Sequence, residues 1–189
     1  MTRGAREEAG FGVLSGRRVA VTRPRAQAEA FAKLLRRHGA EVIIAPLIAI
    51  EDPSDPGALR QAAREADRFD WLVFTSANAV ERFWAALESL GEDAPVLGSV
   101  RVCAVGSATA RAVESRGAKV SLVPEEFVAE KVVDALTRTG DLRERRVLFV
   151  RAEEVRPVIP DALRALGAEV VEVIAYRTVV DRESADALR

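Results

Sequence analysis

Residues 70–80 of this chain read DWLVFTSANAV, an apolar run that leads without a spacer into the start of a helix. Residues 71–74 are all apolar, which predicts a strand covered on both faces, whereas residues 79–90 carry apolar side chains at helical spacing. The junction between them is Thr75-Ser76-Ala77-Asn78. In an open parallel sheet, the carboxyl ends of strands and the starts of the following helices line the binding crevice. The junction therefore predicts a ligand site, although its serine and asparagine are also ordinary helix caps.

Similar apolar runs recur along the chain, and segments with helical periodicity fill most of the gaps between them. This alternation is typical of α/β domains with a parallel sheet and helices on both faces. Gly39, Gly117 and Gly167 each precede one of the runs, and we expect each to end a helix in the left-handed conformation. The predicted strands lie at residues 18–21, 41–45, 71–74, 101–105, 119–123, 146–150 and 169–175.

The chain also repeats itself at a constant offset of 128 residues. Residues 17–46 match residues 145–174 at ten of thirty positions without a gap, and the matches include the pair Arg23 and Arg151. Two unrelated β-α-β units would share periodicity, but an ungapped register of identical arginines and glutamates favours an internal duplication.

Composition and charge limit the classes of function. The chain has 189 residues, 49% of them hydrophobic, which is enough for one large domain or two small ones. Its formal net charge is -1, so there is no broad positive surface for nucleic acid or membrane lipid. No segment approaches the roughly 20 apolar residues that cross a bilayer. Residues 1–16 lack the apolar core of a secretory signal and are interpreted as a mobile leader.

Two single residues narrow the chemistry further. Cys103 is the only cysteine, so the chain has no intrachain disulfide, and a small buried core group in a cytoplasmic protein is expected. His38 is the only histidine and lies near a predicted helix end before Gly39. With no second histidine or nearby cysteine to share a site, neither a catalytic nor a metal-binding role is expected for His38.

Three features together resemble the uroporphyrinogen-III synthase family. They are the junction in residues 70–80, the later turn VGSATA at residues 105–110, and Tyr176 after the last predicted strand. Thr22-Arg23-Pro24 after the first strand extends the resemblance, which covers about residues 17–180. The two junction strings at this separation are fairly specific as a pair.

The resemblance implies two flavodoxin-like lobes joined by a two-stranded ladder, with the substrate in the cleft between them. Members of the family are usually longer, so the first lobe is expected to be incomplete here. The expected parts are a partial first lobe at 17–41, a ladder from 42–50 and 171–180, a complete second lobe at 51–170 and, at 181–189, the start of a return to the first lobe.

The resemblance also implies a reaction, the cyclisation of hydroxymethylbilane to uroporphyrinogen III with loss of water and inversion of the last ring. Loss of the terminal hydroxyl leaves a stabilised azafulvene cation, which pyrrole carbons attack without a protein nucleophile, a metal or a cofactor. The implied protein is a cytoplasmic, monomeric hydro-lyase of tetrapyrrole biosynthesis that binds a small-molecule tetrapyrrole. Two alternatives stay open: a flavodoxin-like ligand-binding module without catalysis, and a truncated synthase that is inactive.

Backbone N–H groups and hydroxyls at helix starts would bind the substrate's carboxylates. The resemblance assigns this role to Thr75, Ser76 and Asn78 at the first junction. At the second junction it assigns the same role to Gly106, Ser107 and Thr109. Helix capping competes with both assignments, with Ser107 well placed to cap a helix at residues 108–115.

Tyr176 is the only tyrosine and the candidate proton donor to the departing hydroxyl. Its alternative is a ring that packs at the ladder. Arg23 and Arg151 follow equivalent strands of the repeat, so each could bind a substrate carboxylate in a bidentate manner. Their alternative is a solvated surface position.

Overall fold

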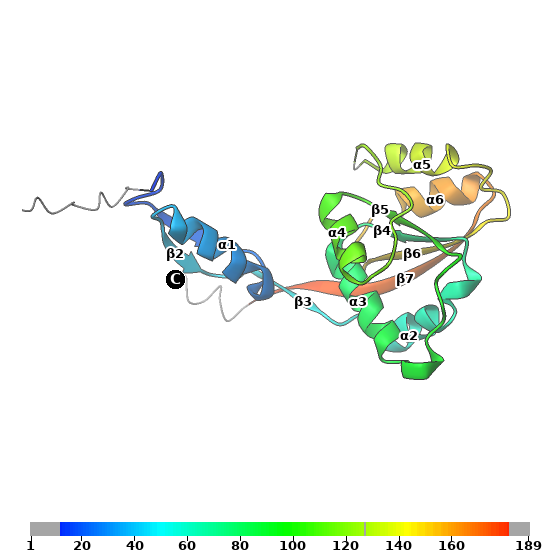
Figure 1. Cartoon of the computed structure of the whole chain (residues 1–189), viewed down its shortest axis with the longest axis horizontal. Coiled ribbons are helices and arrows are strands. Elements are labelled where there is room, and N and C mark those ends of the chain that lie inside the picture. The colour runs from blue at the N-terminus through cyan, green and yellow to red at the C-terminus, as the bar shows by residue number, and fades with distance from the viewer. Residues whose placement is uncertain (1–11, 127, 182–189) are drawn as a thin grey trace, which may run out of the picture. The chain divides into compact units, whose positions relative to one another are not determined.

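The computed structural model describes residues 12–126 and 128–181. They divide into two compact units, which Figure 1 shows as a ribbon. The first unit contains the described residues up to Ile50 and from Val179 onward, and the second runs from Glu51 to Thr178. No helix in the described part of the chain is long and apolar enough to span a membrane.

The first unit is a single β-α-β motif. Strand β1 (Arg18–Val21) leads into helix α1 (Arg25–Arg37), which is followed by strand β2 (Glu41–Ile44). The two strands pair in parallel. Helix α1 buries small alanines against them, and it ends at Gly39, whose φ of 89° is the left-handed conformation expected there.

The strands of the second unit belong to a five-stranded sheet with the order β3-β7-β6-β4-β5, of which most of β3 and the end of β7 are counted in the first unit. The strands β7, β6, β4 and β5 are parallel to one another. All four residues of β4 are buried, so the strand predicted to be covered on both faces lies inside the sheet. The bounds are β3 Ile48–Glu51, β4 Trp71–Phe74, β5 Arg101–Ala104, β6 Arg146–Ala152 and β7 Glu169–Val180.

Helices cover both faces of this sheet, as Figure 1 shows. Helices α5 (Ala129–Thr137) and α6 (Val158–Ala165) lie on one face. The other face carries α2 (Pro56–Arg64), α3 (Ala77–Glu88) and α4 (Ser107–Ser115). Short 3-10 turns occupy Ala66–Arg68 and Gly91–Asp93. The predicted α/β class, with a largely parallel sheet between two layers of helices, is confirmed.

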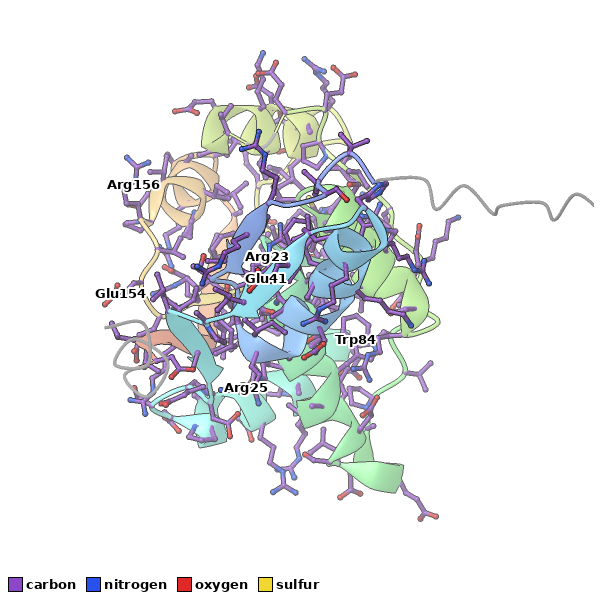
Figure 2. All side chains as sticks on the ribbon, turned by 90° about the vertical axis from the view of Figure 1, so that its left-hand side faces the viewer. Arg23, Arg25, Glu41, Trp84, Glu154 and Arg156 are labelled. Atoms are coloured by element: carbon purple, nitrogen blue, oxygen red, sulfur yellow. The ribbon has the colours of Figure 1, made fainter. Side chains whose placement is uncertain are left out.

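The core of the second unit follows from the alternation of side chains along β4. Trp71 and Val73 belong to the apolar cluster that includes Leu136 of α5 and Leu163 of α6. Phe74 packs against two aromatic rings of α3, at centroid distances of 5.4 and 5.6 Å. One of the two is Trp84, labelled in Figure 2. Full burial of a side chain such as that of Phe74 contributes roughly 1.5–3 kcal/mol to stability.

The predicted duplication is reproduced in the hydrogen bonding. Arg18 lies opposite Glu41 in the first copy, and Arg146 lies opposite Glu169 in the second, in parallel pairs of the same register. Both arginine–glutamate pairs form salt bridges, at 3.7 and 3.3 Å. In each copy the glutamate N–H donates to the carbonyl of the residue before that arginine, at 2.9 Å. Residues 128 apart therefore occupy equivalent places in two β-α-β motifs.

The strand predicted at residues 119–123 is wrong. Only one isolated bridge forms there, between Leu122 and Cys103. Pro124 follows almost at once and has no N–H with which to continue a ladder, and Val123 is exposed. The fifth strand of the sheet is β3 instead.

The range 42–50, expected to belong to a ladder, is divided. Pro46 offers no N–H to a neighbouring strand and separates β2 from β3. Residues 42–44 consequently pair with β1, whereas β3 lies beside β7 in the five-stranded sheet.

The expected mobile leader, residues 1–16, is described only from residue 12. The stretch that follows forms a turn, and Leu14 N–H donates to the His38 carbonyl at 2.9 Å, so these residues are held against the end of α1. Residues 1–11 lie outside the described residues. So do residues 182–189, which contain most of the expected return to the first lobe.

Candidate functional site

The parallel strands of the second unit bring several of the predicted residues to one edge. Thr75 follows β4, Gly106 follows β5 by two residues, and Arg151 lies near the end of β6. Since these strands run in the same direction, their carboxyl ends share an edge of the sheet. Strand β7 also passes this edge, and Tyr176 lies opposite Ala152 there.

Ser76 connects the start of α3 with Tyr176. Its Oγ accepts a hydrogen bond from Ala79 N at 3.2 Å, so Ser76 is the N-cap of α3. The same oxygen lies 3.1 Å from the hydroxyl oxygen of Tyr176, and either hydroxyl can donate. Capping and a place at the site were alternatives in the sequence; in the structure Ser76 combines the cap with a contact to the candidate proton donor.

A β-bulge directs Tyr176 toward this serine. The register of β6 and β7 shifts after Arg151, which lies opposite Ile174, so that Ala152 lies opposite Tyr176. The extra residue is Ala175, and both Ala175 and Tyr176 are buried although they are consecutive. Bulges commonly re-aim a side chain in this way. The Tyr176 ring is therefore packed in the sheet while its hydroxyl meets Ser76.

The second junction is built on Gly106. Its φ of 94° and ψ of 153° lie in a region that is essentially restricted to glycine. Gly106 is also the N-cap of α4, and no side chain caps this helix, which corrects the alternative in which Ser107 is the cap. Ser107 is instead the exposed first residue of α4. The first N–H groups of α4 consequently have no side-chain acceptor and carry the positive end of the helix dipole.

Thr109 does not lie at an open surface of this unit. Its side chain is 3% exposed, because Thr109, Ala110 and Val113 form the buried face of α4. The sequence correctly located the junction but not the side of the helix on which this threonine lies. Thr109 therefore packs among buried residues, and its contact with a substrate carboxylate stays a prediction.

The two arginines of the repeat differ in surroundings. Arg151 donates from Nε to Glu172 at 2.9 Å, and from Nη1 to the carbonyls of Ala152 and Glu153 at 2.9 and 2.8 Å. This guanidinium therefore braces the end of β6 and is half-buried, whereas its contact with a substrate carboxylate stays a prediction. Arg23, in the first unit, is exposed, with its guanidinium carbon 5.1 Å from the Phe31 ring centroid (Figure 2).

One residue that sequence reasoning missed is Arg156, in the loop between β6 and α6. It lines a pocket of about 190 Å³ together with Thr75, and Figure 2 shows it at the margin of the second unit, on the same side as Glu154. The repeat contained no signal for it, because the equivalent position in the first copy is Ala28. We name this the Arg156 pocket; it is lined by Thr75, Ala129, Phe149, Val155, Arg156, Val158 and Ile159.

Charge and metal chemistry at this edge are simple. Within residues 12–126 and 128–181, no group of three or more histidine, cysteine, aspartate or glutamate side chains is placed to hold a metal ion. Burial raises the pKa of the Cys103 thiol from 9.0 to about 12, so the thiol stays protonated and is a poor nucleophile near neutral pH. Hydroxyls, helix starts and arginine are polar groups that this edge presents.

Residues 29–189 match the family model described as uroporphyrinogen-III synthase HemD. The uroporphyrinogen-III synthase of Synechococcus elongatus is 37% identical over 169 residues, covering 87% of this chain and 62% of that protein. A putative uroporphyrinogen-III synthase of Methanothermobacter thermautotrophicus is 31% identical over 173 residues, covering 89% of this chain and 65% of that protein. The chain thus spans slightly less than two thirds of the length of these relatives.

Among solved structures, the fold is similar to that of a mutant uroporphyrinogen III synthase from the extremely thermophilic bacterium Thermus thermophilus. The TM-score is 0.64 with 22% sequence identity, and the match covers 89% of this chain and 65% of the other. A wild-type structure of the Thermus thermophilus protein matches with a TM-score of 0.55 over the same share of this chain. At this identity the likeness concerns the fold alone.

Proposed function

Because this chain belongs to the uroporphyrinogen-III synthase family, we propose that the carboxyl edge of its second unit binds hydroxymethylbilane and takes part in closing it to uroporphyrinogen III. The observation that carries the proposal is the pair of hydroxyls of Ser76 and Tyr176, 3.1 Å apart at the start of α3. The pair lies at the start of α3, and a phenol O–H there is a suitable proton donor to a leaving oxygen.

The substrate carries eight carboxylates, and the edge offers suitable donors for them. Thr75 and Asn78 flank the start of α3, and Gly106 with Ser107 forms the uncapped start of α4. N–H groups at helix starts bind anions without requiring a positively charged protein, which agrees with the net charge of -1. We assign the binding of substrate carboxylates to these four residues.

Tyr176 is the proposed acid. As the carbon–oxygen bond to the terminal hydroxyl breaks, the Tyr176 hydroxyl gives its proton to the departing oxygen, which leaves as water. The pyrrole nitrogen supplies the electron pair that forms the azafulvene cation. The Ser76 hydroxyl donates to the Tyr176 oxygen as negative charge develops there. The substituted pyrrole carbon of the last ring attacks the cation to form a C–C bond, its bond to the old bridging methylene breaks, and the methylene rejoins the ring at its unsubstituted carbon. The proton lost from that carbon returns to the Tyr176 oxygen, which regenerates the acid.

Turnover of hydroxymethylbilane, with separation of type I and type III products, tests this proposal. The wild-type chain is expected to form the type III isomer. General acid catalysis contributes typically 10²- to 10⁴-fold, so Tyr176→Phe should slow type III formation by at least about 100-fold. Thr178→Val, which removes an exposed hydroxyl two residues further along β7, is the matched control and should leave the rate unchanged. Formation of only the type I isomer by the wild-type chain would exclude synthase activity.

A second candidate is binding of a tetrapyrrole without turnover. It is favoured by the burial of Tyr176, whose side chain is 8% exposed and whose hydroxyl has a protein partner. In this case the chain would bind the product while Tyr176→Phe and wild type behave alike in the turnover assay. The monomeric state and the cytoplasmic location expected from the sequence stay predictions.

A further inference from the structure

The Arg156 pocket combines one cationic group with an apolar wall. Arg156 and Thr75 supply the polar groups, while Phe149, Val158 and Ile159 are among its apolar residues. We propose that this pocket binds one acetate or propionate arm of a pyrrole ring of the substrate. The inference rests on the proposed function and extends it to a residue with no role in the mechanism above.

The availability of its guanidinium distinguishes Arg156 from arginines nearby. Arg151, five residues earlier, is engaged by Glu172 and two carbonyls, and Arg177 is paired with Glu51 at 2.8 Å. Among the described residues, no carboxylate lies within 4.0 Å of the Arg156 guanidinium. Arg156 is exposed, so its planar fork of N–H groups can receive both oxygens of a ligand carboxylate.

The size and composition of the pocket fit a side arm better than a ring system. Pockets for whole drug-sized ligands are about 300–1,000 Å³, and this one is about 190 Å³. The one or two methylenes of an acetate or propionate arm would contact the apolar wall, and the carboxylate would reach Arg156 and the Thr75 hydroxyl. A neutral ligand would offer the guanidinium no charged partner.

The position of the pocket connects this anchor with the proposed chemistry. Thr75 lines the pocket, and the next residue, Ser76, contacts the Tyr176 hydroxyl. An arm held at Arg156 would therefore fix its pyrrole ring beside the acid. Such an anchor selects the substrate by its carboxylates and also limits the orientations in which ring closure occurs.

Uroporphyrin III tests the proposal because it is stable, carries the eight carboxylates and absorbs visible light. Its Kd is measured by the shift of its absorbance on titration with the whole chain. An ion pair at an exposed arginine corresponds to up to about fivefold in affinity, so Arg156→Ala should raise Kd about threefold to fivefold. Arg156→Lys keeps the positive charge but loses the planar fork of N–H groups, so its Kd should lie between those of wild type and Arg156→Ala.

Arg64→Ala is the matched control, because Arg64 is an exposed arginine at the end of α2 and does not line the pocket. Its Kd should stay within about twofold of wild type. The octamethyl ester of uroporphyrin should bind wild type and Arg156→Ala equally, because it lacks the carboxylates.

Equal affinities of wild type and Arg156→Ala for uroporphyrin III would overturn the proposal, as would no binding by the wild-type chain. The readout is independent of turnover. Loss of affinity in Arg156→Ala, in a chain that forms no type III product, would retain the carboxylate subsite and reject the synthase activity. Thermal melting of Arg156→Ala at the wild-type temperature confirms that the variant is folded.

Discussion

The hydrogen bond between Ser76 and Tyr176 makes a quantitative prediction about stability. Ser76→Ala removes the cap of α3, which costs about 1 kcal/mol, and it leaves the buried Tyr176 hydroxyl without this partner, which costs about 1–3 kcal/mol more. Tyr176→Phe removes both the hydroxyl and its need for a partner, so about 1 kcal/mol is expected. The double variant should then be more stable than the sum of the two effects predicts, by about 1–3 kcal/mol, because the penalty for the unpartnered hydroxyl is absent from it.

Urea unfolding followed by tryptophan fluorescence measures this coupling. Trp71 and Trp84 are the only tryptophans, and both are buried in the second unit, so the signal reports unfolding of the unit that contains the site. The slope of unfolding free energy against urea should be the same in all variants. Ser76→Thr, which keeps the hydroxyl, should behave close to wild type.

Asp55→Ala provides a control for the loss of a cap alone. Asp55 caps α2 by accepting from Ala58 N at 3.1 Å, and this hydrogen bond does not involve Tyr176. Asp55→Ala should lower the free energy of unfolding by about 1 kcal/mol, and this loss should simply add to that of Tyr176→Phe in the double variant. A coupling energy between Ser76 and Tyr176 below about 0.3 kcal/mol would refute the hydrogen bond as a stabilising contact.

Three further predictions concern buried or constrained residues. A thiol reagent should modify Cys103 only after unfolding, because the thiol is buried. The raised pKa of the Cys103 thiol contributes stability that is complete below pH 9 and is lost as pH rises from 9 toward about 12. Urea titrations at several pH values would measure this loss. Gly106→Ala should lower the unfolding free energy by about 1–3 kcal/mol in the same assay, because its backbone conformation disfavours a Cβ. Thr109→Ala should lower stability while changing the uroporphyrin III Kd less than twofold, because the side chain is buried; a selective loss of affinity would return Thr109 to the binding surface.

The local pattern predicted the parts of the fold that depend on neighbouring residues in the chain. The apolar run of β4, the helix after it and the left-handed glycines were all evident, because periodicity and φ preference act over a few residues. The duplication was evident for a related reason, since an ungapped register preserves the pairing of Arg18 with Glu41 and of Arg146 with Glu169.

Strand pairing was less accessible from the sequence. Residues 119–123 have a strand-like composition yet make only one bridge, and β3, which lies within the expected ladder range, is the fifth strand of the sheet. A strand forms only where another strand offers it a ladder, so its existence depends on residues far away in sequence. Proline at positions 46 and 124 limited both segments.

The sequence by itself determined the α/β class, the repeat and the edge of the sheet where polar residues gather. Only the tertiary structure decided which side chains meet there, because Ser76 and Tyr176 are 100 residues apart and a bulge in β7 brings them together. It also decided that Arg151 is bound by its own surroundings while Arg156 faces an open pocket. The partner of a long charged side chain depends on which groups lie near it in the folded protein, and the local sequence pattern does not specify those groups.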